Sequence, residues 1–186
     1  MVHLWHSNLA FSLMADITFD ETNLILDRQQ INQKIKRMAF ELYEHNFEEK
    51  EILLAGIQEN GYLLAQLLAK ELKAIAPIAV ELASITLDKI HPLLHPLVVE
   101  PENLPLQDRV VILADDVLNT GKTLAYAMQY FLKAEVKKLE TATLINRHHT
   151  LYPINATYTG LSLSTTLQEH IRVVLTEGDR FGAYLV

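Results

Sequence analysis

Apolar residues follow two alternating patterns along the chain of 186 residues. In some stretches they recur every three or four positions, which is typical of amphipathic helices, and in others they form short runs, unbroken or partly alternating, which are typical of strands. The first pattern predicts helices over residues 28–45, 62–75 and 123–133. The second predicts strands over residues 52–57, 78–87, 110–114, 138–145, 156–158, 171–175 and 183–186. Strands that alternate with helices predict an α/β protein with a mostly parallel sheet flanked by helices.

Polar residues and prolines set the expected ends of these elements. Asp27 is a suitable N-cap for the first helix, and Pro77 follows the end of the second. Four prolines stand between residues 91 and 108, where they break regular structure and predict a long excursion over the surface.

The predicted strand 110–114 is followed at once by Asp115 and Asp116, and then by a turn from Thr120 to Thr123 that opens a helix. A fully apolar run fits a central parallel strand, whose carboxyl end is where ligands bind in open α/β sheets. Adjacent carboxylates accept hydrogen bonds from a diol but repel a phosphate. Gly121 and the helix N-terminus offer backbone N–H groups to that phosphate. The pattern therefore predicts a site for a sugar phosphate.

Two other interpretations of this motif are weaker. A Walker A loop requires a glycine where this chain has Asp116, and a carboxylate there would oppose bound phosphates. An ordinary surface turn with a Thr cap at Thr120 or Thr123 does not explain two acids directly after an unbroken apolar strand.

Two further loops are expected at the same edge of the sheet. The segment from Gly56 to Gly61 joins a strand to a helix, and Arg147, His148 and His149 follow the strand that ends near residue 145. Each is a candidate ligand loop, with an ordinary turn and a solvated loop cluster as the alternatives. His91 and His95 have the spacing of metal ligands only on a helix, and the flanking prolines exclude that helix.

Composition and charge narrow the class of protein. Hydrophobic residues make up 49% and charged residues 21% of the chain, as in globular proteins, and its length favours one domain. The chain has no cysteine, which excludes disulfides and thiolate metal sites and makes a reducing cytoplasm the simplest location. The first residues lack the positive charge and unbroken apolar core of a signal peptide, and no run is long enough for a bilayer. The formal net charge of −7 argues against broad affinity for nucleic acid.

At residues 110–123 the chain resembles the type I phosphoribosyltransferases, whose signature is an apolar run, two acids and a Thr-Gly-x-Thr turn. From Leu24 to Leu185 it is similar to a narrower group, the pyrimidine-operon attenuation regulators that are also uracil phosphoribosyltransferases. The matching segments, in order, are Ile25–Asp27, Gly56–Ile57 with Gly61, Ile85–Leu87, Val110–Thr123, Arg147–His149 with Pro153, and Tyr158–Leu175.

The resemblance implies a fold, ligands and roles for individual residues. It implies one phosphoribosyltransferase domain over residues 24–186 with a small hood region, preceded by an N-terminal extension, residues 1–23, in which translation starts at Met1 or Met14. It implies that phosphoribosyl pyrophosphate binds with Mg²⁺, which the ligand carries and the protein does not hold directly. It implies a nucleobase as acceptor, with uracil the first candidate, and a homodimer or higher homo-oligomer.

The implied site residues fall into three groups. Asp115, Asp116 and Asn119 are the catalytic candidates, and the two acids hold the ribose hydroxyls. The ribose and 5-phosphate site comprises Asp115, Asp116, Val117, Leu118, Asn119, Thr120, Gly121, Lys122 and Thr123. The pyrophosphate loop comprises Gln58, Glu59, Asn60 and Gly61, and the base-binding group comprises Arg147, His148 and His149.

Several positions depart from the resembled group. The pyrophosphate loop has no basic residue, and Asn119 stands where many relatives have an Asp that can accept a proton, which an amide cannot do. These departures motivate an alternative, a nucleotide-sensing, RNA-binding attenuation regulator with little or no catalysis. Lys34, Lys36 and Arg37 offer it a small basic patch, which is equally a solvated helix face. A third possibility is an interaction protein that keeps the fold without the reaction.

Overall fold

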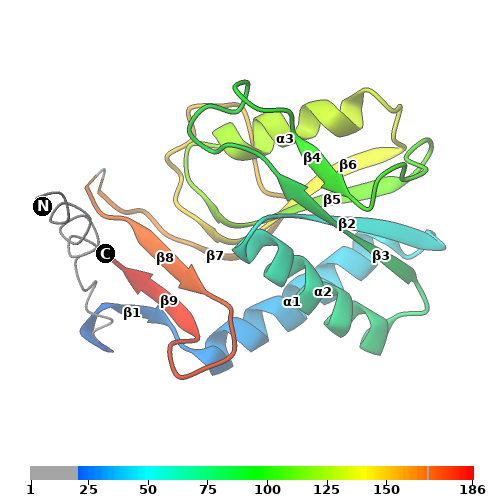
Figure 1. Cartoon of the computed structure of the whole chain (residues 1–186). Coiled ribbons are helices and arrows are strands. Elements are labelled where there is room, and N and C mark those ends of the chain that lie inside the picture. Colours follow the sequence, from blue (N-terminus) through cyan, green and yellow to red (C-terminus); the bar gives the residue numbers. More distant parts are fainter. Residues whose placement is uncertain (1–20, 167) are drawn as a thin grey trace, which may run out of the picture.

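The computed structural model describes residues 21–166 and 168–186, and its larger sheet has the strand order β4-β3-β2-β5-β6-β7 (Figure 1). Neighbouring strands are parallel except β4, which runs antiparallel to β3 at one edge. Residues 1–20 of the expected N-terminal extension, with both candidate start residues Met1 and Met14, lie outside the described residues. The strands are β2 (Glu51–Ile57), β3 (Ala79–Thr86), β4 (Val98–Glu100), β5 (Val110–Leu118), β6 (Lys138–Asn146) and β7 (Tyr158–Ser162).

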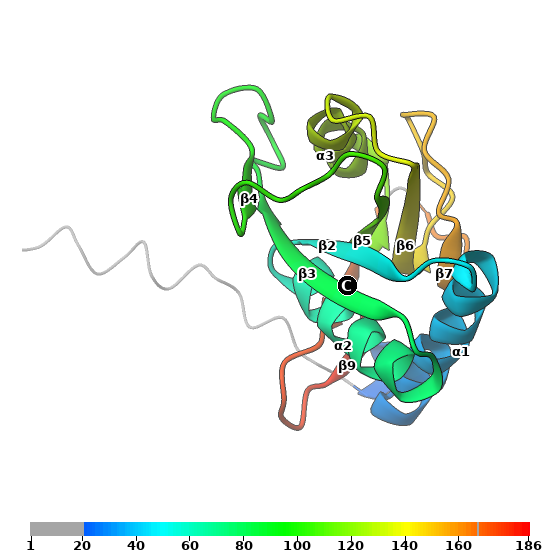
Figure 2. The same ribbon diagram turned by 90° about the vertical axis from the view of Figure 1, so that its right-hand side faces the viewer.

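Helices cover both faces of this sheet. In Figure 2, α1 (Arg28–Asn46) and α2 (Asn60–Ile75) lie on one face, and α3 (Lys122–Leu132) lies on the other. Alternate residues of β2 serve the two layers: Leu54 packs in the cluster that includes α1 and α2, and Leu53 packs in the cluster that includes α3. A strand covered on both faces is apolar throughout, as the sequence pattern indicated. The predicted α/β fold with a mostly parallel sheet flanked by helices is confirmed.

A smaller antiparallel sheet stands beside the main one and forms the expected hood. Its order is β1-β9-β8, from β1 (Leu24–Leu26), β8 (Ile171–Val174) and β9 (Gly182–Leu185) (Figure 1). Asn60, the first residue of α2, donates from Nδ2 to the carbonyl of Val173 at 2.9 Å. The hood is therefore tied to the start of α2. Within the described residues, none of the helices has the length and apolar character needed to span a membrane.

Two short strands were not predicted, and one was misplaced. β4 lies within the proline-rich stretch 91–108, which was expected to be irregular, and pairs Val99 with Ile85. β1 pairs with β9 from the other end of the chain. Three residues are too few to show a period, and these pairings come from tertiary contacts. The strand expected at 156–158 is β7, which begins at Tyr158.

The start of α1 agrees with the sequence in atomic detail. Asp27 Oδ1 accepts from the backbone N–H of Gln30 at 2.7 Å, and Gln30 Oε1 accepts from the backbone N–H of Asp27 at 2.9 Å. This reciprocal pair is a capping box, which satisfies backbone donors that a helix start leaves unpaired.

Glycines let α2 begin directly against the ends of the central strands. A Cβ on Gly61 would lie 2.6 Å from the carbonyl oxygen of Ala114 and 2.9 Å from the Cα of Asp115. A Cβ on Gly56 would lie 2.4 Å from the Cα of Tyr62. These neighbours are backbone atoms, so they cannot move aside as side chains can. Gly61 sets the distance between α2 and β5, and Gly56 sets the distance between α2 and β2.

The closeness at Gly61 predicts a stability cost for Gly61→Ala. The added methyl group forces α2 away from β5, and overpacking of this kind costs about 1–3 kcal/mol of unfolding free energy. Denaturant unfolding measures that loss.

Lys70→Ala, at an exposed position of the same helix, is the matched control and changes the unfolding free energy by less than about 0.5 kcal/mol. Equal stability of Gly61→Ala and the wild type would contradict the tight fit at Gly61.

Candidate functional site

The two acids lie in the carboxyl-terminal half of β5, which continues through them to Leu118, whereas the pattern predicted a strand that ends at residue 114. Asp115 is buried and pairs in register with Thr143 of β6, and Asp116 is half-buried. Asp116 Oδ1 accepts from the backbone N–H of Val117 at 2.9 Å, and its Oδ2 accepts from Asn60 Nδ2 at 3.0 Å. Asn60 thus connects the acid pair to the hood. The arrangement fixes the Asp116 carboxylate at the open edge of the sheet.

Burial gives Asp115 an unusual protonation equilibrium. Loss of solvent, reinforced by the neighbouring Asp116 carboxylate, raises the pKa of Asp115 from 3.8 to about 8, and Lys89 opposes the rise. Asp115 is therefore largely neutral at pH 7 in the folded protein. A protonated carboxyl donates one hydrogen bond and still accepts others, which suits contact with a sugar hydroxyl.

The predicted 5-phosphate turn, Thr120–Thr123, joins β5 to α3. Gly121 caps α3 with φ +79°, a left-handed conformation that side chains disfavour, and a Cβ there would lie 3.1 Å from Ile154 Cβ. Thr120 Oγ1 accepts from the backbone N–H of Lys122 at 3.3 Å, and the Thr120 carbonyl accepts from Leu151 and Tyr152. The turn is rigid, and it directs the N-terminus of α3 toward the ligand edge, which favours an anion.

The candidate pyrophosphate loop is the link between β2 and α2. The Gln58–Glu59 peptide bond is cis, and Gln58 Oε1 accepts from Thr86 Oγ1 at 2.9 Å. Glu59 is exposed and makes no side-chain cap on α2. Asn60 and Gly61 meet the acid pair, as described above. The loop therefore offers backbone groups to a ligand, and its one charged side chain is accessible to solvent.

The three base-binding candidates differ in their surroundings. Arg147 is buried and donates hydrogen bonds only to protein groups, Asn119 Oδ1 at 3.2 Å among them. His149 lies with Nε2 2.7 Å from the Thr165 carbonyl, and His148 is exposed with φ +57°. All three line a cavity of about 430 Å³, together with Asn119, Thr120, Thr150, Leu151 and His170. The cavity adjoins the phosphate turn and could hold an acceptor base.

Lys122 points away from its own turn. Its Nζ donates to the carbonyl of Ile90 at 2.7 Å, which connects the phosphate turn to the loop between β3 and β4. Asp88 shapes that loop by accepting from the backbone N–H groups of Ile90 and His91, both at 2.8 Å. The Lys122 ammonium group is thus engaged in holding a loop.

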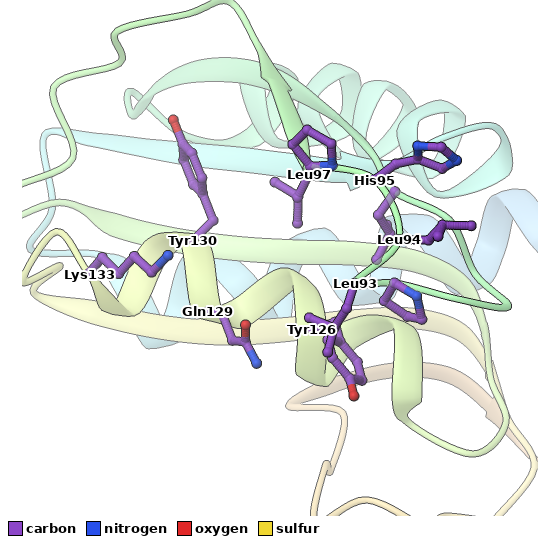
Figure 3. A pocket seen from close by; sticks show the side chains of 11 residues that line it. Leu93, Leu94, His95, Leu97, Tyr126, Gln129, Tyr130 and Lys133 are labelled. Carbon is purple, nitrogen blue, oxygen red and sulfur yellow. The ribbon is translucent and has the colours of Figure 1, made fainter.

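The same loop forms a second cavity, of about 400 Å³, against α3 (Figure 3). Leu93, Leu94, His95 and Leu97 line it from the loop, and Tyr126, Gln129, Tyr130 and Lys133 line it from α3. Leu93 and Leu94 are 77% and 66% exposed, so the loop carries unusually accessible apolar side chains. No residue of the predicted ribose and phosphate site lines this cavity.

The candidate basic patch on α1 is reduced by internal contacts. Arg37 donates to the carbonyls of Thr159 and Gly160 and pairs with Glu41 at 3.3 Å. Lys34 is half-buried and Lys36 is exposed. Arg37 therefore joins α1 to β7, and its pairing with Glu41 offsets part of the positive charge of the patch.

The acid pair is chemically suited to Mg²⁺, a hard cation that prefers carboxylate oxygens and retains several waters. Within residues 21–166 and 168–186, no three His, Asp or Glu side chains are arranged to hold a metal ion.

The sequence did not predict several contacts and lining residues of the site. Lys122 was assigned to phosphate from its motif, and nothing in the sequence indicates its contact with Ile90. His170 lines the cavity but stands alone before a strand, without a motif. Thr165 and Thr166 belonged to a matched segment, which could have identified that loop as part of the site.

Comparison with known proteins assigns the chain and its fold to a family. Residues 21–176 match the model of the phosphoribosyl transferase domain. The chain belongs to this family of enzymes.

Named relatives narrow the comparison. The "Bifunctional protein PyrR" of Alkaliphilus metalliredigens is 35% identical over 166 residues, which cover 84% of this chain and 90% of the relative. The protein of the same name from Bacillus pumilus is 33% identical over 175 residues, 87% of this chain and 94% of the relative.

Solved structures support the fold. A hypoxanthine-guanine phosphoribosyltransferase from Bacillus anthracis superposes with a TM-score of 0.70 at 18% identity, over 88% of this chain and 97% of that one. The hypoxanthine phosphoribosyltransferase of Trypanosoma cruzi gives 0.73 at 13% identity, over 88% and 95%.

The raised pKa of Asp115 predicts how its replacement changes stability with pH. In the unfolded chain Asp115 loses its proton near pH 4, whereas in the folded protein it keeps the proton up to about pH 8. Its contribution is therefore complete below pH 4 and declines as the pH rises to about 8. Asp115→Asn is permanently neutral, so its melting temperature relative to the wild type should increase between pH 4 and pH 8. Thermal unfolding at several pH values measures this difference.

Asp108→Asn is the control, because Asp108 is exposed at the opposite end of β5. It should show no such trend. A difference between Asp115→Asn and wild type that stays constant with pH would contradict the neutral state of Asp115.

Proposed function

We propose that this protein binds phosphoribosyl pyrophosphate with Mg²⁺ and transfers ribose 5-phosphate to a nucleobase, with uracil as the first acceptor to test. The observation that carries the proposal is the acid pair at the end of β5, followed within five residues by the glycine-capped start of α3. One ligand that needs both parts is a ribose with a 5-phosphate.

Each part of the ligand has a matching group. The carboxyls of Asp115 and Asp116 bind the two ribose hydroxyls, and the N–H groups of residues 120–123 bind the 5-phosphate. The backbone of residues 58–61 faces the pyrophosphate, and Lys89 supplies positive charge near the acid pair. Mg²⁺, carried by the ligand, supplies neutralisation of the pyrophosphate charge.

The reaction exchanges one bond at the anomeric carbon for another. The bond from C1′ to the pyrophosphate oxygen breaks, a bond from C1′ to the base nitrogen forms, and the proton on that nitrogen leaves to solvent. Asn119 cannot receive this proton, because its amide is not basic at neutral pH. The site contributes position and electrostatic stabilisation, and Asn119 does not serve as the base that takes the acceptor's proton.

The resemblance in sequence favours a pyrimidine acceptor and leaves regulation as an alternative. The relatives named PyrR are called bifunctional, and the resemblance in sequence is to uracil phosphoribosyltransferases that regulate transcription. We prefer the enzyme, because Arg37 is engaged in holding β7 and the net charge is −7. We also propose a cytoplasmic location, which a chain without cysteine suits, and a homodimer or higher homo-oligomer.

The direct test is pyrophosphate release from phosphoribosyl pyrophosphate and Mg²⁺ with each common base in turn. Uracil should support release, and Asp116→Asn should weaken binding of phosphoribosyl pyrophosphate by at least about tenfold, because one partner of the diol is lost. Isothermal calorimetry measures the second effect.

Asp108→Asn again serves as control and should bind like the wild type. Unchanged affinity in the double variant Asp115→Asn with Asp116→Asn would show the ribose assignment to be wrong.

Because Asn119 cannot take the acceptor's proton, we expect the acidity of the acceptor to govern the rate. 5-Fluorouracil is more acidic than uracil, so at pH 7 it should react several-fold faster per unit concentration, and the advantage should shrink as the pH rises. Initial rates of both acceptors across pH 6.5 to 9 measure this. A fixed ratio between them would point to a general base in the site.

The RNA-binding alternative has its own measurement. Filter binding with a pyrimidine-leader RNA at two salt concentrations should detect no specific complex. An affinity that falls steeply with salt would instead favour the regulator.

A further inference from the structure

Arg147 occupies the centre of a hydrogen-bond cluster beneath the acceptor cavity. The residue is 3% exposed, and its Nε donates to Thr165 Oγ1 at 2.9 Å. Its Nη2 donates to the carbonyls of Thr166 and Glu169 at 3.1 and 2.5 Å. The remaining contact, from Nη1 to Asn119 Oδ1, reaches the residue that precedes the phosphate turn. The guanidinium group therefore joins the segment 165–169, which leads into β8 of the hood, to that turn.

This contact settles which way the Asn119 amide faces. A guanidinium carries only donors, so the atom of Asn119 that meets Arg147 must be the oxygen. The amide nitrogen is then directed away from Arg147. No partner for Asn119 Nδ2 is found in the part of the chain that the structure describes, and Asn119 is half-buried and lines the acceptor cavity. Asn119 thus offers an unpaired N–H donor at the wall of the cavity that it lines.

The other groups around the cavity reinforce this polarity. His149 Nε2 must carry its hydrogen toward the carbonyl of Thr165, so this ring nitrogen offers no acceptor to a ligand. The lining residues include no Asp or Glu. A base that enters meets donors from Asn119 and has no carboxylate to receive its own N–H groups.

We propose that Arg147 is a positioning residue that fixes Asn119 as a hydrogen-bond donor, and that this donor selects bases presenting a carbonyl oxygen to it, the chemistry of an oxopyrimidine such as uracil. The inference rests on the proposed function, because it assumes that the cavity holds the acceptor base. It assigns Asn119 to recognition of the base, and it assigns Arg147 to the orientation of Asn119.

The test compares two ligands that share the ribose phosphate and differ in the base. Uridine 5′-monophosphate and ribose 5-phosphate are titrated into wild type, Asn119→Asp and Asn119→Leu. Wild type should bind the nucleotide more tightly than the sugar phosphate. Asn119→Leu should lower that preference by about tenfold, the usual effect of one lost hydrogen bond in a confined site. Asn119→Asp should lower it further, because its carboxylate repels a carbonyl oxygen.

The role of Arg147 is tested by the same quantity, the ratio of the affinity for uridine 5′-monophosphate to the affinity for ribose 5-phosphate. Arg147→Gln gives Asn119 a neighbour that both donates and accepts, so the amide can turn and the preference for the nucleotide should fall severalfold. Arg28→Gln is the matched control, because it makes the same substitution at an arginine that pairs with Glu177 and does not line the cavity, so it should leave the ratio unchanged. If Arg147→Gln does not fold, Arg147→Lys tests the same point: it keeps a positive N–H donor for Asn119 Oδ1 and should preserve most of the ratio, and a complete loss of the ratio in this variant would contradict the positioning role.

The outcomes separate the inference from the function beneath it. Losses that are equal for the nucleotide and the sugar phosphate in Asn119→Asp would overturn the inference and leave the proposed function standing. Failure of both ligands to bind the wild type would overturn the proposed function, and the inference with it. A nucleotide-specific loss in Asn119→Asp and in Arg147→Gln, with Arg28→Gln unaffected, would support both.

Discussion

The site depends on how closely the first turn of α2 approaches the end of β5. Gly61 leaves no space for a side chain between these elements, so the helix start and the two acids share one small region. That closeness removes water from Asp115, and burial is the first cause of its raised pKa. It also places Asn60 where its amide meets both Asp116 and the hood. One backbone contact thus determines the charge of one acid and the orientation of the other.

Strong local patterns were sufficient to predict the frame of the molecule. The apolar run at the start of β5 indicates a strand that is buried on both faces. The acids that follow this run are therefore expected at the ligand edge of the sheet. β1 and β4 could not be predicted this way, since each has three residues and owes its existence to a partner strand. The family signature supplied what local patterns lack, namely which ligand this edge serves.

The chemistry of the basic residues was harder to predict, because it depends on contacts between distant segments. The sequence places Arg147 in a loop and does not indicate its partners. In the structure its hydrogen-bond acceptors come from residues 165–169 and from Asn119. Lys122 and Arg37 were candidates for phosphate and RNA, and the structure directs both to backbone carbonyls. In each case a long cationic side chain joins two segments of the fold. Positive charge in a motif therefore does not by itself identify an anion site.

The hydrogen bonds around Asp116 have a consequence for the entropy of ligand binding. Val117 and Asn60 each hold one carboxylate oxygen, so the side chain has lost its rotational freedom before any ligand arrives. That ordering cost belongs to folding, and a ribose that binds does not incur it again. Each oxygen still has a lone pair for a hydroxyl, in a direction that the fold has set. If Asp116 binds the ribose as proposed, a sugar that lacks one hydroxyl, or carries it on the opposite face, would meet a carboxylate that cannot reorient, so the fixed orientation of this residue would discriminate ribose from its close analogues.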